Sequence, residues 1–240
     1  MNIAVLMIAT PELNFLEYCV DNTKEYCEKN KYDFLLYDKR LDQSRPVTQN
    51  KLLYVIKNID KYDWIFMKDA DSLIYNFSIR LEEFIDDEFN YIASYGRDKS
   101  TFQMGHVLIK CTEEVKQQLQ NLYDTEFLKY NKERSCEQKP FNTFIREGKI
   151  TKCKYLPKRI LNACPNPVLY DETLIQRNPA MYNRTFINKE HAVGTILPDS
   201  FIVHWPGEDN KGASHGNFAK KELSEYISHY NYVKNKYGWK

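Results

Sequence analysis

The amino-acid sequence predicts an α/β fold in which helices flank a mixed, mostly parallel central sheet. Two observations lead to this prediction. Short apolar runs of strand length alternate with longer segments of helical periodicity over the first 70 residues. The chain has 240 residues, of which 42% are hydrophobic, and this is enough to bury a substantial core within one domain. A β-α-β order of this kind implies right-handed crossovers between parallel strands.

The first half of the chain carries the clearest pattern. Its three strands are short and apolar, as expected for strands buried on both faces of a sheet. The predicted elements are strands at 3–8, 33–37 and 64–67 and helices at 13–29 and 49–60.

The second half is less regular, but it still alternates. Ser135 and Gln138 form a capping-box pattern that predicts a helix to about Glu147, with Pro140 in its first turn and Gly148 ending it. The other predicted elements are strands at 91–95, 105–111, 151–156 and 201–205, helices at 112–130 and 218–237, and a long loop or lid at 165–195.

Composition excludes several classes of protein. With 34 Lys plus Arg against 33 Asp plus Glu, the net charge of +1 is unlike that of a basic nucleic-acid coat. No apolar run is long enough to span a membrane, and the first ten residues resemble a buried strand rather than a signal peptide. The six cysteines contain no CxxC pair. They are typical of buried thiols in a reducing compartment, so we expect a cytoplasmic protein.

The strongest chemical signal is the segment WIFMKDADSLIYN at 64–76. Asp69 and Asp71 follow a buried strand with only Ala70 between them, at the edge where open α/β sheets bind ligands. Two adjacent carboxylates repel each other unless a cation lies between them. Their oxygens suit Mg²⁺ or Mn²⁺, so we expect a metal site here, with an exposed acidic turn as the alternative.

A second signal is the segment FIVHWPGEDNKG at 201–212. His204 ends a strand, and Gly207 and Lys211 follow in one loop, where glycine allows close approach of a ligand and lysine supplies charge for phosphate. A single histidine at a strand end is usually structural. An imidazole added to two carboxylates would favour Mn²⁺ over Mg²⁺.

These segments resemble a known family. The chain is similar to GT-A fold glycosyltransferases, in particular to the galactosyl/xylosyl/mannosyl group typified by the fungal α-1,2-galactosyltransferase. The similarity extends over five stretches in the same order, covering about residues 50–212. They are NKLLYVIKNIDKYDWIFMKDADSLIYN, FQMGHVLIK, CEQKPFNTFI, YLPKRILNACP and FIVHWPGEDNKG.

The resemblance implies a metal-dependent enzyme that uses a nucleotide-diphospho-sugar, with a UDP-sugar as the first choice, and a glycan or glycosylated acceptor. Asp69, Asp71 and His204 would hold Mn²⁺ or Mg²⁺ and neutralise the leaving diphosphate. The remaining donor contacts would come from Thr10, Lys51, Asp69, Ala70, Gly207 and Lys211.

The resemblance also implies a retaining reaction with front-face attack. Gln138 would lie beside the anomeric carbon, Glu137 in the acceptor cleft, and Asp98 and Arg97 near the donor sugar. Residues 1–100 would form the nucleotide-binding half of a single domain, 1–240, and residues 101–240 the acceptor-binding half.

Two positions depart from the family pattern. Met104 replaces a smaller residue, which could alter the donor-sugar pocket, and Lys139 adds charge near the acceptor. Other interpretations stay open for two residues: Lys51 could be a solvated helix residue, and Gln138 a helix cap. Two functional alternatives remain, a haloacid-dehalogenase-like phosphohydrolase and a non-catalytic protein that binds glycan or nucleotide-sugar.

Overall fold

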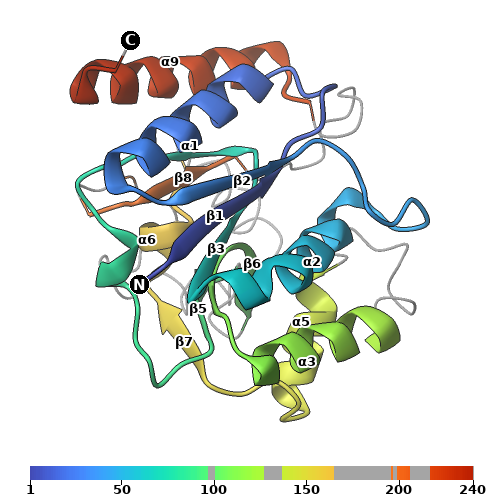
Figure 1. Cartoon of the computed structure of the whole chain (residues 1–240). Coiled ribbons are helices and arrows are strands. Elements are labelled where there is room, and N and C mark those ends of the chain that lie inside the picture. Colours follow the sequence, from blue (N-terminus) through green and yellow to red (C-terminus); the bar gives the residue numbers. More distant parts are fainter. Residues whose placement is uncertain (97–100, 127–136, 165–195, 197–198, 206–216, 240) are drawn as a thin grey trace, which may run out of the picture.

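The computed structural model contains a six-stranded central sheet with helices on both faces (Figure 1). It describes residues 1–96, 101–126, 137–164, 196, 199–205 and 217–239. The strands are β1 (Ile3–Ile8), β2 (Asp33–Tyr37), β3 (Trp64–Lys68), β4 (Ser72–Ile74), β5 (Tyr91–Tyr95), β6 (Phe102–Lys110), β7 (Cys153–Leu156) and β8 (Ile202–His204). The α-helices are α1 (Leu16–Asn30), α2 (Val47–Asn58), α3 (Glu113–Asn121), α5 (Gln138–Arg146), α6 (Lys158–Leu161) and α9 (Lys220–Tyr237).

The order of the central sheet is β2-β1-β3-β6-β5-β7. The pairs β1–β2, β1–β3 and β5–β7 are parallel, and β6 runs antiparallel to both of its neighbours. The mixed, mostly parallel sheet expected from the sequence is therefore confirmed. Because β6 is reversed, its beginning lies at the same edge as the carboxyl ends of β1 and β3.

Alternate residues of β1 point to opposite faces of the sheet, as strand geometry requires. Ala4, Leu6 and Ile8 pack in the core under α2, α3 and α5, whereas Ile3 and Val5 pack in the core on the face of α1. Both faces are thus covered, which explains why the strand is apolar at every position.

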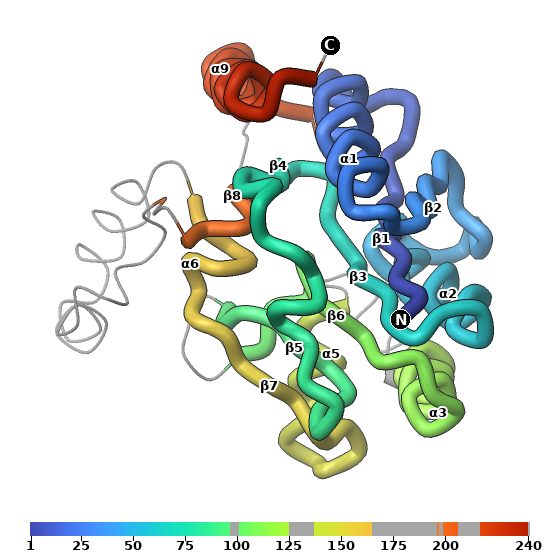
Figure 2. The backbone as a smooth tube through the Cα atoms, turned by 60° about the vertical axis from the view of Figure 1, so that its left-hand side comes forward, coloured from blue at the N-terminus to red at the C-terminus, as the bar shows by residue number. Residues whose placement is uncertain are grey.

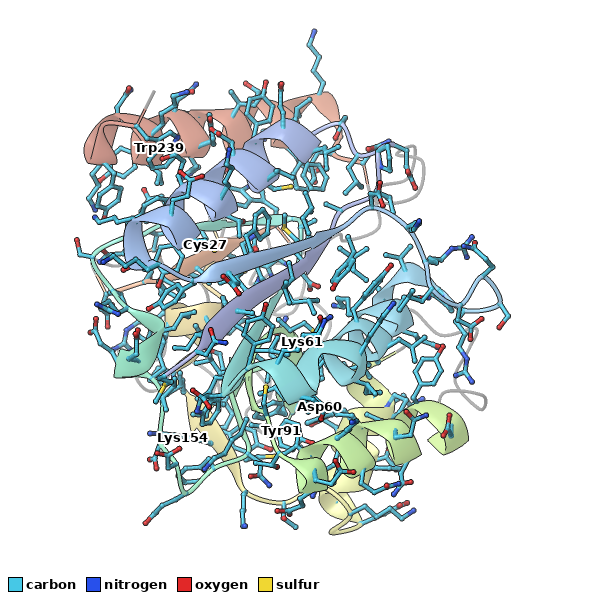
Figure 3. The ribbon with its side chains drawn as sticks, in the orientation of Figure 1. Cys27, Asp60, Lys61, Tyr91, Lys154 and Trp239 are labelled. Atoms are coloured by element: carbon cyan, nitrogen blue, oxygen red, sulfur yellow. The ribbon has the colours of Figure 1, made fainter. Side chains whose placement is uncertain are left out.

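The helices α1 and α9 lie side by side on one face, although they belong to opposite ends of the chain (Figure 2). Aromatic side chains fill the space between them: Phe15 stacks on Phe218 with ring centroids 4.2 Å apart, and Tyr18 meets Tyr230 edge-on at 5.1 Å. Trp239 follows α9 and lies at the end of the layer formed by α1 and α9 (Figure 3).

Most predicted elements are confirmed, but their ends differ in places. The α5 helix begins at Gln138 without a side-chain cap, so the predicted capping box does not start it, and Ser135 lies outside the described residues. Pro140 is in the first turn, and Gly148 follows the helix with φ +69°, a conformation that favours glycine. The predicted helix at 112–130 ends as regular α-helix at Asn121. The loop at 165–195 lies outside the described residues.

A second, two-stranded sheet was not predicted. In it β4 pairs antiparallel with β8, and the register places Ser72 opposite His204. Five cysteines of the described segments are free thiols, as expected. Among the described residues, no helix combines the length and the apolar character needed to cross a membrane.

Candidate active site

The two acidic residues of the DAD segment lie directly after β3, as predicted. The register of β3 with β6 continues past Lys68, so that the Asp69 amide donates to the Gly105 carbonyl at 2.8 Å. A Cβ atom built at Gly105 would overlap the Asp69 carboxylate and lie 2.7 Å from Gln103 Nε2. Glycine at this position therefore leaves the space that the Asp69 side chain occupies.

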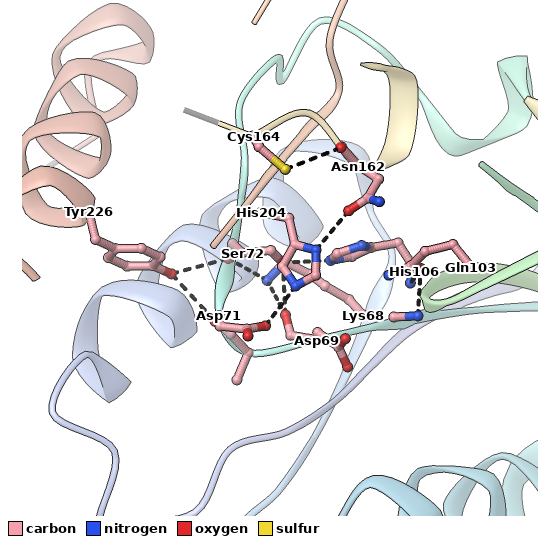
Figure 4. Close-up of polar contacts among 12 residues, drawn as sticks. Lys68, Asp69, Asp71, Ser72, Gln103, His106, Asn162, Cys164, His204 and Tyr226 are labelled. Carbon is pink, nitrogen blue, oxygen red and sulfur yellow. Dashed lines mark hydrogen bonds and ion pairs between the residues drawn. The ribbon is translucent and has the colours of Figure 1, made fainter. Parts of the chain in front are cut away.

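His204 reaches the acidic pair through the β4–β8 sheet (Figure 4). Its Nε2 atom lies 3.2 Å from Asp71 Oδ1, and its Nδ1 lies 2.7 Å from Asn162 Oδ1. Since the Asn162 oxygen only accepts, Nδ1 donates to it, and Nε2 is the ring nitrogen that faces Asp71. A histidine with one nitrogen bonded to an oxygen and the other directed at a carboxylate is oriented to share a cation with that carboxylate.

Asp69, Asp71 and His204 together form a cluster whose ligand atoms lie within 4.8 Å of one another. Ligand atoms on opposite sides of a Mg²⁺ ion are about 4.2 Å apart, so small side-chain shifts would close the cluster around an ion. Two carboxylates and one imidazole are also the donor types that Mn²⁺ and Mg²⁺ accept. The residues therefore fit a divalent metal.

Lys51 forms an ion pair with Asp69 and a second one with Glu137, at 3.2 Å from Oε1. Its side chain is only 5% exposed, so the alternative of a solvated helix residue is wrong. Burial by itself would lower the pKa of Lys51, but the two carboxylates outweigh it and raise the pKa above its usual value. The lysine thus links the DAD segment to the start of α5.

The two aspartates have different electrostatic surroundings. Burial, together with the charge of Asp71, raises the pKa of Asp69 against the opposing effect of Lys51. Burial acts in the same direction on Asp71, but His204 outweighs it and lowers the pKa of Asp71.

A buried polar layer that the sequence did not reveal lies beneath the cluster. Lys68 and His106 are completely buried, and the ring of His106 meets that of His204 edge-on at 4.8 Å. Burial lowers the pKa of Lys68 to about 8 and holds the pKa of His106 well below its usual value. Ser72 Oγ, which donates to the Asp69 carbonyl, lies 2.8 Å from His106 Nε2.

The other predicted residues fall into two groups. Gln138 lies at the start of α5, where its Oε1 accepts from the Met104 amide at 3.3 Å instead of capping the helix. Thr10 and Ala70 are partly buried, and continuing the β1–β3 register brings Thr10 to the level of Asp71. Asp98, Arg97, Gly207 and Lys211 lie outside the described residues.

The side chain of Met104 points away from this edge. It is fully buried in the core that contains residues of α2 and α5, and its neighbours Gln103 and Gly105 face the site instead. The direction of its side chain therefore gives no support to the expectation that Met104 alters the donor-sugar pocket, because alternate residues of a strand face opposite sides.

Comparisons with known proteins give one family match and several similar folds. Residues 3–90 match the model of the galactosyl transferase GMA12/MNN10 family. No curated protein matches the sequence significantly.

Several solved structures share the fold along almost the whole chain. A glycosyltransferase involved in glycosylation of the major capsid of PBCV-1 aligns with 96% of this chain and 100% of its own, at 13% identity and a TM-score of 0.59. The glycosyltransferase GlyE of Streptococcus pneumoniae TIGR4 aligns with 99% of this chain and 63% of its own, at 12% identity and a TM-score of 0.57. The galactosyltransferase LgtC, solved with donor and acceptor sugar analogues, aligns with 97% of this chain and 96% of its own, at 12% identity and a TM-score of 0.52. The chain therefore shares the fold of these glycosyltransferases, and its first 90 residues, which include the DAD segment, are similar to the galactosyl transferase GMA12/MNN10 family.

Proposed function

We propose that the protein is a metal-dependent, retaining glycosyltransferase that moves a sugar from a nucleotide-diphospho-sugar, preferably a UDP-sugar, to a hydroxyl group of a glycan or other acceptor. The observation that carries the proposal is the convergence of Asp69, Asp71 and His204 at the carboxyl edge of the sheet. Ligands of open α/β sheets bind at this edge.

The metal, Mn²⁺ or Mg²⁺, would be held by these three side chains and would supply positive charge for the departing diphosphate. In this proposal Asp69 also holds Lys51 in place, because its carboxylate forms an ion pair with that lysine. We propose that Lys51, Thr10 and Ala70 line the nucleotide site, and that Gly207 and Lys211 complete it around the diphosphate.

Glu137 and Gln138 would form the acceptor side of the site. Glu137 is paired with Lys51 and only 10% exposed, which supports a role in holding the lysine rather than in attacking the sugar. The amide oxygen of Gln138 is committed to the β6 backbone, so its N–H groups are what it offers to a substrate. With neither residue placed as a nucleophile, front-face attack assisted by the leaving phosphate fits best, and Asp98 would contact the donor sugar.

The phosphohydrolase alternative finds no support. Asp69 follows the third strand of the sheet and is ion-paired with Lys51, whereas that class uses an aspartate after its first strand as nucleophile. The pair Asp86 and Asp87 is engaged elsewhere, with Lys154 and Lys110.

A reducing compartment such as the cytoplasm is also part of the proposal. It is supported by the free thiols, since oxidising compartments favour disulfides.

The first experiment is a thermal-shift panel of UDP-, GDP-, CMP- and dTDP-sugars, each with Mn²⁺ and with EDTA. A ligand at 100 times its Kd stabilises the folded protein by about 2.7 kcal/mol, which raises Tm measurably. We expect one nucleotide class to raise Tm only when Mn²⁺ is present. Equal shifts in EDTA would contradict metal dependence, and no shift with any donor would favour a protein that binds glycan alone.

A further inference from the structure

The turn that carries the acidic pair, Asp69–Ser72, is held from below by the side chain of Lys68. The Lys68 ammonium donates to the Asp69 carbonyl at 3.0 Å and to the Ser72 carbonyl at 2.8 Å, and so spans the turn. The hydroxyl of Ser72 adds a second bond to the Asp69 carbonyl at 2.8 Å. Both ends of the turn are thereby fixed by groups that are fully buried.

The middle of the turn is held by the C-terminal part of the chain. The Trp205 amide donates to the Asp71 carbonyl at 2.8 Å. The hydroxyl of Tyr226, on α9, donates to the Ser72 carbonyl at 3.1 Å and lies 3.5 Å from the Ala70 carbonyl (Figure 4). The carbonyls of Asp69, Asp71 and Ser72 therefore accept hydrogen bonds from protein groups, and that of Ala70 faces the same hydroxyl.

This arrangement has a chemical consequence for cation binding. Peptide carbonyls are good ligands for divalent ions, but those of Asp69, Asp71 and Ser72 already accept hydrogen bonds. The two carboxylates remain as the groups of the turn that can hold an ion, and their Cα atoms are fixed by the bonds beneath them. Mutation of groups that orient metal ligands typically lowers metal affinity by about 10–100-fold.

We propose that Tyr226 is a positioning residue for the metal site, acting through its hydroxyl on the backbone of the Asp69–Ser72 turn. The inference rests on the proposed function, because it assumes that Asp69, Asp71 and His204 hold the metal. Without the hydroxyl, the Ser72 carbonyl loses its hydrogen bond from α9, and the Ala70 carbonyl loses a polar neighbour. The turn can then rotate its carboxylates away from His204.

The chain offers a matched control on the same helix. Tyr230 lies one turn after Tyr226, is also buried, and donates its hydroxyl to Asp21 on α1 rather than to the turn. Replacing either tyrosine by phenylalanine removes one hydrogen-bonded hydroxyl and keeps the aromatic ring. A purely structural role would make the two replacements equivalent.

The experiment compares Mn²⁺ binding by the wild type, Tyr226→Phe and Tyr230→Phe, using calorimetric titration with Mn²⁺ alone and thermal melts in EDTA. We expect Tyr226→Phe to raise the Kd for Mn²⁺ about tenfold, the lower end of the effect of residues that orient metal ligands. Tyr230→Phe should change it less than twofold, although both variants melt at a lower temperature than the wild type. Equal Kd values for the two variants would overturn the inference.

A second variant keeps the test decisive if Tyr226→Phe does not fold. Ser72→Ala removes the hydroxyl that donates to the Asp69 carbonyl, and it too should weaken Mn²⁺ binding about tenfold. An unchanged Kd would contradict the inference. Failure of the wild type to bind Mn²⁺ would instead overturn the proposed metal site, and the inference with it. If the wild type binds Mn²⁺ and Asp71→Asn does not, the proposed metal site stands, and the Kd of Tyr226→Phe then tests the inference alone.

Discussion

The charge of the candidate site depends on a few buried side chains that neutralise one another. Lys51 lies between Asp69 and Glu137, and His204 lies beside Asp71. Two adjacent carboxylates repel each other, and this repulsion adds to the effect of burial, which is the main reason that the pKa of Asp69 is raised. A divalent ion would relieve this repulsion, and the protein without metal relies on Lys51 and His204.

Asp71→Asn should therefore abolish the metal-dependent effect of the donor while leaving the metal-free fold stable. The amide has the same shape as the carboxylate and removes the repulsion with Asp69, but it also loses the favourable interaction with His204 that lowers the pKa of Asp71. We therefore expect Tm in EDTA to lie near or slightly below that of the wild type. Thermal melts with and without Mn²⁺ and donor measure both effects.

The matched control is Asp86→Asn, which removes a carboxylate that bonds to Lys154 at 2.9 Å, away from the site. It should leave the response to Mn²⁺ unchanged. A large fall of Tm for Asp71→Asn in EDTA would show that Asp71 is a structural residue.

Gly105→Ala should weaken metal binding much more than it weakens the fold. The added methyl group would meet the ends of the Asp69 and Gln103 side chains, which can move aside, rather than rigid backbone. We expect the Kd for Mn²⁺ to rise at least about tenfold, as when a ligand loses its orientation. Calorimetric titration measures the Kd, and circular dichroism confirms that the fold is retained.

A double-mutant cycle supplies the control for this prediction. In an Asp69→Ala background the methyl group has space, so Gly105→Ala should cost clearly less stability than in the wild type. Equal costs in both backgrounds would mean that Gly105 acts through the backbone instead of through Asp69.

Sequence reasoning found the candidate metal ligands of this site but not the residues that support them. Asp69, Asp71 and His204 lie in recognisable segments at strand ends, and position at a strand end can be inferred from periodicity. The predicted third strand ends at residue 67, whereas Lys68 is the last residue of β3 and fully buried. Its partners lie on distant elements, and no local pattern predicts such a contact.

At the level of secondary structure, the short β4–β8 sheet decides where His204 lies. Both strands have three residues, which is too short for a periodic signal, so neither their pairing nor β4 itself could be predicted. The long, alternating elements of the first half were predicted closely because each contains a full apolar face. The order of the strands beyond β3, which depends on the reversed β6, was not predicted.

Asn22 on α1 is the residue that fixes the far end of β4. Its side chain accepts from the Ile74 amide at 2.8 Å and donates to the Ile74 carbonyl at 3.0 Å, and all of these groups are buried. Asn22→Ala leaves two buried backbone groups without partners, so we expect a loss of roughly 2–4 kcal/mol in the free energy of unfolding. Chemical denaturation measures it.

Asn30→Ala on the same helix is the comparison. Asn30 donates to the Tyr26 carbonyl within α1 and is partly exposed, so its replacement should cost less than about 1 kcal/mol. Equal losses in the free energy of unfolding for the two variants would show that the bonds from Asn22 to β4 stabilise the fold no more than the bond of Asn30 within α1.

The molecule as a whole places one site across distant parts of the chain. The family match ends at residue 90 and includes the acidic pair, but Glu137, His204 and Tyr226 come from the remainder. The sheet explains this, since β6 pairs with β3, and β8 pairs with β4 just beyond the acidic pair. We therefore regard the site as a property of the complete fold.

The last residues of the chain return to its first third. Trp239 stacks on Phe77 with ring centroids 4.8 Å apart and planes only 7° from parallel, and its Nε1 donates to Asp21 at 3.3 Å. The opposite part of α9 carries Tyr226 beside the acidic turn. The two attachments of this helix can therefore be tested separately.

Trp239→Ala should lower global stability without changing metal affinity. Losing the stack and the hydrogen bond should cost about 1–3 kcal/mol, and each kcal/mol lowers Tm by about 2–4 °C in a domain of this size. Tyr226 and Tyr237 are about 16 Å apart along the helix, at 1.5 Å per residue, so the acidic turn should keep its geometry while the helix remains folded. Melts and Mn²⁺ titrations of Trp239→Ala, with the half-exposed Tyr232→Ala on the same helix as control, give both quantities. A parallel loss of Mn²⁺ affinity in Trp239→Ala would mean that the whole helix, and not the hydroxyl of Tyr226 alone, holds the turn in place.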